Sequence, residues 1–166
     1  FNGVTLSPEA ILPQSEAALR DIKLLGALLT AAESTGSYAA ALDLVVAYLT
    51  SRIQFGRLIG SYQSLKHPTV DILIGMDSAR TLIYHAATVV GDQSLDQDAE
   101  IACRMAKAQA TEALLYAGDR AIQFHGGMGF TYECDAQLYL RRALWSQHQF
   151  GDAQHHRTHL ASLLLD

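Results

Sequence analysis

The sequence is poor in the residues that build disulfide frameworks, nucleic-acid surfaces and membrane spans. Its 166 residues include only 2 cysteines, 3 prolines and 1 tryptophan, and no run of lysine or arginine occurs. Two cysteines make neither a disulfide framework nor a metal site, which favours a reducing, cytoplasmic setting. The net charge of −5 argues against nucleic acid as a partner. No apolar stretch reaches the length of a membrane span, so none is predicted.

Helical periodicity, by contrast, runs through most of the chain. A hydrophobic content of 49% with 17% charged residues indicates one globular domain with a real core. Long helices joined by short connectors predict an all-α, antiparallel (up-down) four-helix bundle over residues 15–166. Residues 1–14 alternate apolar and polar side chains and predict a short extended lead-in. Apolar residues recur at helical spacing over residues 15–51, about 67–90, 97–124, 135–147 and 153–165.

Three residues predict local features of the first two helices. Gly36 lies in a weak Ser-Thr-Gly-Ser segment, where it could break the first helix or let another helix approach closely. Gly56 is a natural C-cap for that helix, because glycine readily adopts the positive φ of a helix exit. Pro68 fits the first turn of the second helix, where its missing N–H costs nothing.

A cluster of glycines ends the third helical pattern. Gly126, Gly127 and Gly129 follow Gln123 and His125 directly. Such glycines allow a positive-φ exit and leave backbone N–H groups open to phosphate oxygens. A Rossmann loop would need a preceding strand, and a P-loop would need Gly-Lys-Ser/Thr, so both motifs are excluded. A plain helix–turn–helix and a ligand-contacting turn both remain open.

Arg52 is the second candidate for ligand contact. It ends the first long helix, where a cation also favours the helix macrodipole, so both a structural and a phosphate-binding role fit. With Gln54, Gln63 and Gln123 it supplies polar groups suited to the pyrophosphate and adenine of a dinucleotide.

Three histidines near the end of the chain raise the possibility of a metal site. His155 and His159 share one helix face, with His156 beside them. The zincin signature needs a glutamate after the first histidine, and only Asp152 offers a carboxylate at ligand spacing. We therefore predict no metal site and interpret these histidines as surface or interface residues.

Taken together, three motifs resemble the C-terminal helical domain of acyl-CoA dehydrogenases. They are residues 52–56 (Arg-Ile-Gln-Phe-Gly), Tyr62-Gln63, and residues 123–130 (Gln-Phe-His-Gly-Gly-Met-Gly-Phe). The resemblance covers essentially the whole chain, and residues 1–4 look like the exit from that family's central β-domain. It implies FAD as cofactor, an acyl-CoA thioester as substrate, and a homo- or hetero-oligomer arranged as a dimer of dimers.

The resemblance also implies a flavin site that crosses a subunit boundary. The residues matching Arg52 and Gln63 approach the adenine and pyrophosphate end of a flavin that lies mostly in the neighbouring subunit. Gly151 is expected beside the substrate. The expected flavin-binding residues are Arg52, Gln54, Phe55, Tyr62, Gln63, Gln123, Phe124, His125, Gly126, Gly127 and Gln154.

Both positions at which family members carry the catalytic base lack a carboxylate here. The reaction removes a proton α to the thioester while hydride leaves the β carbon for the flavin. Aligning residues 141–143 with the family's Arg-Asp-Ala segment places Phe150 at the usual glutamate. Counting back from Phe55 places the alternative glutamate near Gly26. The sequence therefore predicts no catalytic base in this chain.

Three functional hypotheses follow. In the leading one, the chain is the C-terminal domain of an FAD-dependent subunit without its own base, resembling the partner chains of some actinobacterial sterol-degrading acyl-CoA dehydrogenases. In the second, Asp152 or another acid is the base, although a carboxylate there would repel the flavin phosphates. In the third, the chain is a non-enzymatic assembly subunit. The 166-residue piece alone is expected neither to hold flavin tightly nor to turn over substrate.

Overall fold

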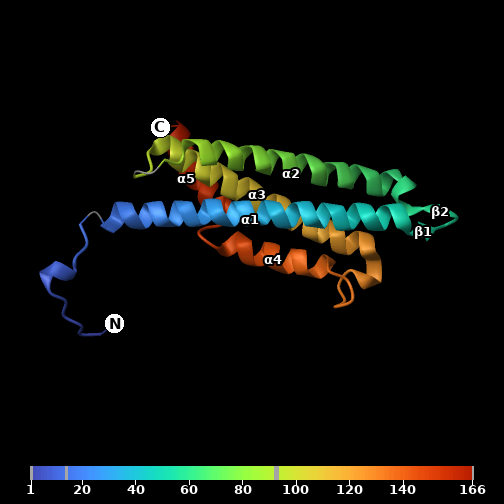
Figure 1. The fold of residues 1–166 in the computed structure, drawn as a ribbon, viewed down its shortest axis with the longest axis horizontal. Coiled ribbons are helices and arrows are strands. Elements are labelled where there is room, and N and C mark those ends of the chain that lie inside the picture. Colours follow the sequence, from blue (N-terminus) through green and yellow to red (C-terminus); the bar gives the residue numbers. More distant parts are fainter. Residues whose placement is uncertain (1, 14, 92–93, 166) are drawn as a thin grey trace.

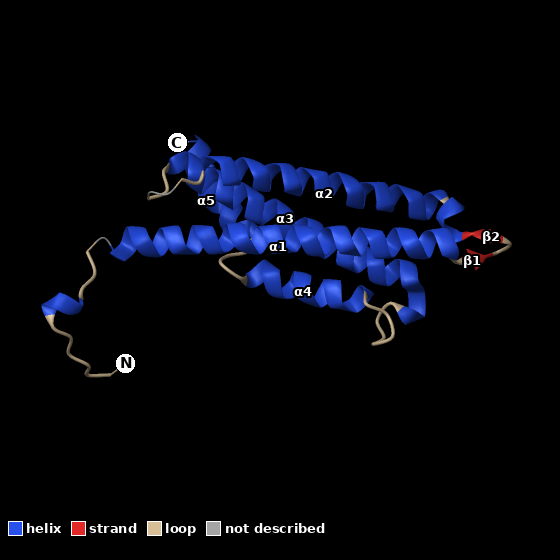
Figure 2. Ribbon diagram, viewed as in Figure 1, coloured by secondary structure: helices blue, strands red, loops and turns tan. Residues whose placement is uncertain are grey.

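The computed structural model describes residues 2–13, 15–91 and 94–165, so the predictions at positions 1, 14 and 166 lie outside the described residues. The all-α class is confirmed, and the described residues form five α-helices, one for each helical pattern in the sequence (Figure 2). The helices are α1 (Ser15–Ser51), α2 (Gln63–Val89), α3 (Gln97–His125), α4 (Ala136–His148) and α5 (Ala153–Leu165).

The helices form a long bundle with α3 at its centre. Helices α1 to α4 run in alternating directions along the long axis (Figure 1). Helix α3 contacts α1, α2, α4 and α5. Half of its buried residues are alanine, whose small side chain lets neighbouring helices approach closely. Gly118 allows one such close approach, since a Cβ there would lie 2.8 Å from the Cα of Leu140 in α4.

One end of the bundle is closed by a small hairpin that the periodicity did not predict. Strand β1 (Ile53–Gln54) pairs antiparallel with β2 (Arg57–Leu58), and the 3-10 turn η2 (Ile59–Ser61) leads into α2. A second 3-10 turn, η3 (Gly126–Met128), follows α3. The hairpin lies beyond the ends of α1 and α2 (Figure 1).

Three local predictions were wrong. Helix α1 runs unbroken through Gly36, which is exposed and where a Cβ would meet no atom within 4 Å. Gly56 has φ +80° but lies in the hairpin turn, since α1 already ends at Ser51. Helix α2 begins at Gln63, four residues early, because the carbonyl of Tyr62 accepts hydrogen bonds from the N–H groups of residues 65 and 66. Pro68 therefore lies in the second turn.

The lead-in lies away from the bundle. Residues 2–13 are all exposed and extend from the start of α1, with one 3-10 turn, η1 (Pro8–Ala10) (Figure 1). None of the described helices combines the length and apolar character needed to cross a membrane.

Candidate functional site

A groove of about 530 Å³ opens at the hairpin end of the bundle. The last turns of α1 and α3, the hairpin and the start of α2 contribute its walls, so segments distant in sequence meet there. The groove contains eight of the residues expected to contact flavin, namely Arg52, Gln54, Phe55, Tyr62, Phe124, His125, Gly126 and Gly127.

A stacked ring pair forms one wall of the groove. The rings of Tyr48 and His125 lie 4.2 Å apart between centroids, at an interplanar angle of 25°. The Nδ1 atom of His125 lies 2.7 Å from the carbonyl oxygen of Ala121. Because a carbonyl can only accept, Nδ1 is the donor in this contact. Sequence reasoning missed Tyr48, although it lies one helical turn before Arg52.

The groove also holds cationic and exposed aromatic groups. Arg52 is exposed and forms no ion pair with any acid in the part of the chain that the structure describes. The Arg57 guanidinium lies over the Tyr62 ring, 3.8 Å from its centroid. Phe55 is 91% exposed at the hairpin turn and has φ +53°. An unpaired guanidinium beside exposed rings suits an anionic aromatic ligand such as a nucleotide.

The three glycines after α3 have different physical roles. Gly126 has φ +59° and caps the helix, its N–H donating to the carbonyl of Gln123. Gly129 packs against α3, since a Cβ there would lie 2.3 Å from the carbonyl oxygen of Ile122. Gly127 has no positive φ, and a Cβ added to it would meet no atom within 4 Å. The fold therefore does not require glycine at 127, and its bare backbone borders the groove.

Three of the four glutamines of the predicted set lie outside the groove, and only Gln54 lines it. Gln63, the first residue of α2, and Gln123, in the last turn of α3, are exposed beside it but do not line it. Gln154 lies on α5, toward the opposite end of the bundle, where its amide reaches the hydroxyl of Thr158 at 3.5 Å.

The two expected base positions meet in space, far from the groove. A Cβ at Gly26 in α1 would lie 2.5 Å from two ring atoms of Phe150. Phe150 has φ +57° and Gly151 has φ +100°, so the segment between α4 and α5 turns sharply and lays the phenyl ring on α1. A hydrocarbon ring occupies the place where either position would present a carboxylate.

This contact predicts a coupled pair of mutations. Gly26→Ala should lower the unfolding free energy by about 1–2 kcal/mol, because its methyl group must displace the Phe150 ring. In a Phe150→Ala background the same change should be neutral or stabilising by about 0.5–1 kcal/mol, the usual gain from replacing glycine within a helix. A double-mutant cycle in urea measures the coupling. Equal effects of Gly26→Ala in both backgrounds would contradict the contact.

Asp152 caps a helix. Its Oδ1 atom accepts a hydrogen bond of 2.7 Å from the backbone N–H of His155, in the first turn of α5. That backbone hydrogen bond is the main cause that lowers the pKa of Asp152 below its usual value. Capping by a carboxylate of this kind stabilises a helix N-terminus.

A buried lysine holds the turn that contains Phe150. Lys107 of α3 is fully buried, and its Nζ donates to the carbonyls of Ser146 at 3.0 Å, Gly151 at 2.9 Å and Gln147 at 3.4 Å. Burial lowers its pKa to about 8. Sequence reasoning missed this residue, although a lone lysine on an alanine-rich helix face was the available signal.

The three histidines of α5 pack against one another. The His155 ring lies edge-on to those of His156 and His159, with centroids 5.3 Å and 4.5 Å apart. Within residues 2–13, 15–91 and 94–165, no group of three or more histidine, cysteine or acidic side chains is placed to hold a metal ion.

Comparison with known families agrees with the motifs. A family model described as "Acyl-CoA dehydrogenase, C-terminal domain" matches residues 24–165. The chain belongs to this family. The predicted membership in the acyl-CoA dehydrogenase family is thereby confirmed.

Individual relatives show the same assignment. The chain is 37% identical over 145 residues to acyl-CoA dehydrogenase IpdE2 of Mycolicibacterium smegmatis, which covers 86% of this chain and 44% of that protein. It resembles the structure of butyryl-CoA dehydrogenase from Megasphaera elsdenii, with 26% identity, a TM-score of 0.79, and coverage of 87% and 38%. A Tcur3481-Tcur3483 steroid ACAD variant gives 26% identity, a TM-score of 0.83, and coverage of 90% and 40%. The chain thus spans less than half the length of these relatives.

Proposed function

We propose that this chain is the C-terminal helical domain of an FAD-dependent acyl-CoA dehydrogenase subunit, and that its groove contacts the adenine and pyrophosphate end of the flavin. The observation that carries the proposal is the meeting of Arg52, the hairpin and the residues after α3 in one groove. Bound FAD would accept the hydride that leaves the β carbon of an acyl-CoA thioester.

Each group in the groove suits one part of that ligand. Arg52 has no carboxylate partner in the described part of the chain, so its charge is available to a phosphate. The open backbone at Gly127 allows a phosphate to approach closely. The Tyr48–His125 pair and Phe55 offer ring surfaces for the adenine. Gln63 and Gln123 are near enough to add amide contacts if their side chains turn toward the groove.

The flavin in this groove belongs mostly to a neighbouring subunit in our proposal. The groove is open, and its most exposed aromatic, Phe55, projects at the hairpin turn with only an edge-on contact to the Tyr62 ring. A second chain that carries the flavin-binding β-domain would cover it. Residues 1–14 would lead from such a β-domain of this chain, α1 to α4 would form the predicted four-helix bundle, and the assembly would be a dimer of dimers, in the cytoplasm.

We further propose that the catalytic carboxylate comes from that second chain. One expected base position holds Phe150, a hydrocarbon ring, and the other holds Gly26, which has no side chain. Neither residue can accept a proton. Asp152 is engaged at the N-terminus of α5, which disfavours the self-sufficient alternative. Among the similar structures, the Tcur3481-Tcur3483 steroid ACAD is named for two chains, which supports a two-chain enzyme.

Co-expression tests this proposal. The full-length protein should show flavin absorbance and acyl-CoA dehydrogenation only when produced with a partner dehydrogenase that carries a glutamate at one of the base positions. Robust activity from the protein alone would contradict the requirement for a partner chain. If Asp152→Asn then abolished that activity, Asp152 would be identified as the base. A complex without any flavin absorbance would instead support a purely structural subunit.

Gly127 gives a sharper test of the groove. Gly127→Ala should leave the unfolding free energy within about 0.5 kcal/mol, because its methyl group meets no protein atom. Flavin affinity of the complex should nevertheless fall roughly tenfold, a loss of about 1.4 kcal/mol. The matched control is Gly36→Ala, another exposed glycine without neighbours, which should leave flavin affinity unchanged. Equal flavin titration curves for the two variants would refute contact at Gly127.

A further inference from the structure

A second pocket, of about 80 Å³, lies next to Phe150 between α1, α3 and α5. Its lining combines Arg20 and Lys23 of α1, Arg104 of α3 and His156 of α5 with the Phe150 ring. About 10–15 Å³ of such space is enough for one water molecule, so this pocket has room for a small polar group. It is separate from the groove at the hairpin end, with which it shares no residue.

The pocket contains a buried imidazole without a partner. His156 is 1% exposed, and neither ring nitrogen forms a hydrogen bond within the described residues. The Gly151 carbonyl lies close enough to raise the pKa of His156 slightly, but it forms no hydrogen bond of good geometry with the ring and already accepts one from Lys107. Buried polar atoms are almost always hydrogen-bonded, so a missing partner in a pocket indicates a bound ligand or water.

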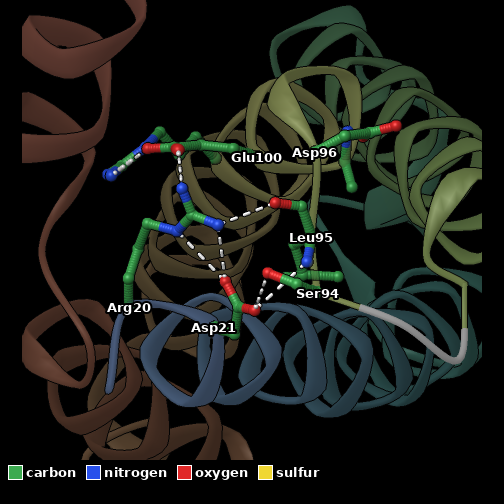
Figure 3. A network of polar contacts seen from close by, with 8 residues as sticks. Arg20, Asp21, Ser94, Leu95, Asp96 and Glu100 are labelled. Carbon is green, nitrogen blue, oxygen red and sulfur yellow. Dashed lines mark hydrogen bonds and ion pairs between the residues drawn. The ribbon is translucent and has the colours of Figure 1, made fainter. Parts of the chain in front are cut away.

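Of the cations that line this pocket around the imidazole, two form ion pairs with carboxylates and one does not. Figure 3 shows Arg20 between the carboxylates of Asp21 and Glu100. Arg104 also binds Glu100, with its Nε atom 2.8 Å from Oε1. The other nearby acid, Asp152, caps α5. Lys23 forms no ion pair with any described acid.

The cations also determine the protonation of the imidazole. Burial, then the charges of Lys107 and Arg104, lower the pKa of His156 to about 4. At neutral pH the ring is therefore uncharged, with one nitrogen that donates and one that accepts. Three cations, Arg20, Lys23 and Arg104, line the pocket, and only two carboxylates, Asp21 and Glu100, pair with them. The excess positive charge attracts an anion rather than a cation.

We propose that this pocket binds a single carboxylate group, which pairs with Lys23 and accepts a hydrogen bond from the ring of His156. The carboxylate belongs either to a small free acid or to the acyl group of a thioester that carries a second carboxylate. The site itself stands independently of the proposed function, and only the thioester source rests on it.

The experiment uses the full-length protein in its natural complex and two matched probe pairs. Acetate is compared with acetamide, its neutral counterpart, by isothermal titration in zwitterionic buffer at pH 7. Acetate should bind saturably and acetamide should not. Lys23→Ala should weaken acetate binding at least fivefold, since Lys23 is exposed and its removal leaves the fold intact. Lys66→Ala, an exposed lysine on α2, is the control and should leave acetate binding unchanged.

The second probe pair separates the two sources. If the ligand is a dicarboxylic thioester, glutaryl-CoA should bind more tightly than pentanoyl-CoA and compete with acetate. If acetate binds but the two thioesters bind equally, the carboxylate is a free acid and the site stands. Equal binding of acetate and acetamide, or acetate binding that is unaffected by Lys23→Ala, overturns the proposal and leaves water as the partner of His156. None of these outcomes depends on whether the groove holds flavin, which absorbance reports separately.

Discussion

Lys107→Met should lower the unfolding free energy by about 3 kcal/mol, because hydrogen bonds from a charged donor contribute about 1.5–3 kcal/mol each. The lysine is fully buried, and its three N–H groups match the carbonyls of Ser146, Gln147 and Gly151. Its pKa of about 8 keeps the amine protonated at pH 7, so all three donors are present. Methionine fills a similar volume but donates nothing, and it leaves these carbonyls without a partner.

The effect of Lys107 should be local as well as global. Two of the carbonyls end α4, and the third lies after Phe150, so the ammonium fixes the turn that lays the phenyl ring on α1. Hydrogen exchange of residues 148–152 should therefore accelerate more than exchange in α2. Lys66→Met is the control, because this lysine is exposed, and it should change stability by less than about 0.5 kcal/mol. If Lys107→Met left the free energy of unfolding unchanged, the prediction would be wrong. Water would then satisfy the three carbonyls as well as the ammonium group does.

The sequence predicted the helices well where apolar spacing was long. Helices α1 and α5 begin and end where the pattern placed them, and α3 extends one residue further, to His125. The pattern failed around residues 52–66, because a two-residue strand is too short to show alternation. It also placed Gly56 at a helix end, since a positive-φ glycine serves a helix exit and a hairpin turn equally well.

The candidate sites were predictable only where a motif marks them. Arg52 and Gly127 were found because they stand in recognisable stretches, and the structure brings them to one groove. Tyr48, Lys107 and His156 were missed as site residues, because their roles depend on which helix faces which. Helical periodicity reports that a position is buried, but it does not report the carbonyls or cations that another helix places beside it. The contact between Gly26 and Phe150 was likewise invisible, although both were singled out.

The final prediction concerns the pH dependence of stability. In the unfolded chain His156 titrates near its usual pKa of 6.5, whereas in the folded protein its pKa is about 4. Between these values the unfolded state binds the extra proton, so the free energy of unfolding falls as pH drops from 6.5 toward 4. At 1.36 kcal/mol per pKa unit this single group should remove roughly 3 kcal/mol of stability over that range.

His156→Phe should abolish this part of the acid sensitivity. A phenyl ring has a similar shape and leaves no nitrogen unpaired, so stability at pH 7 should be unchanged or slightly higher. Urea titrations in buffers without carboxylates, from pH 7.5 to 4.5, should show the variant overtaking the wild-type protein as pH falls. His148→Phe is the control, since His148 is exposed at the end of α4. Asp21 and Glu112, whose pKa values are lowered mainly by hydrogen bonds from Arg20 and Arg157, contribute equally to all three proteins and cancel in the difference curve. The pKa of Asp152 is lowered mainly by the backbone N–H of His155 and partly by His148 and His156, so each variant removes one of the latter two histidine charges and His148→Phe controls for that loss. If the free energy of unfolding fell with pH in parallel for the wild-type and His156→Phe proteins, the pKa of His156 would not be lowered in the folded protein. A bound hydrogen-bond acceptor would then already stabilise the protonated imidazole.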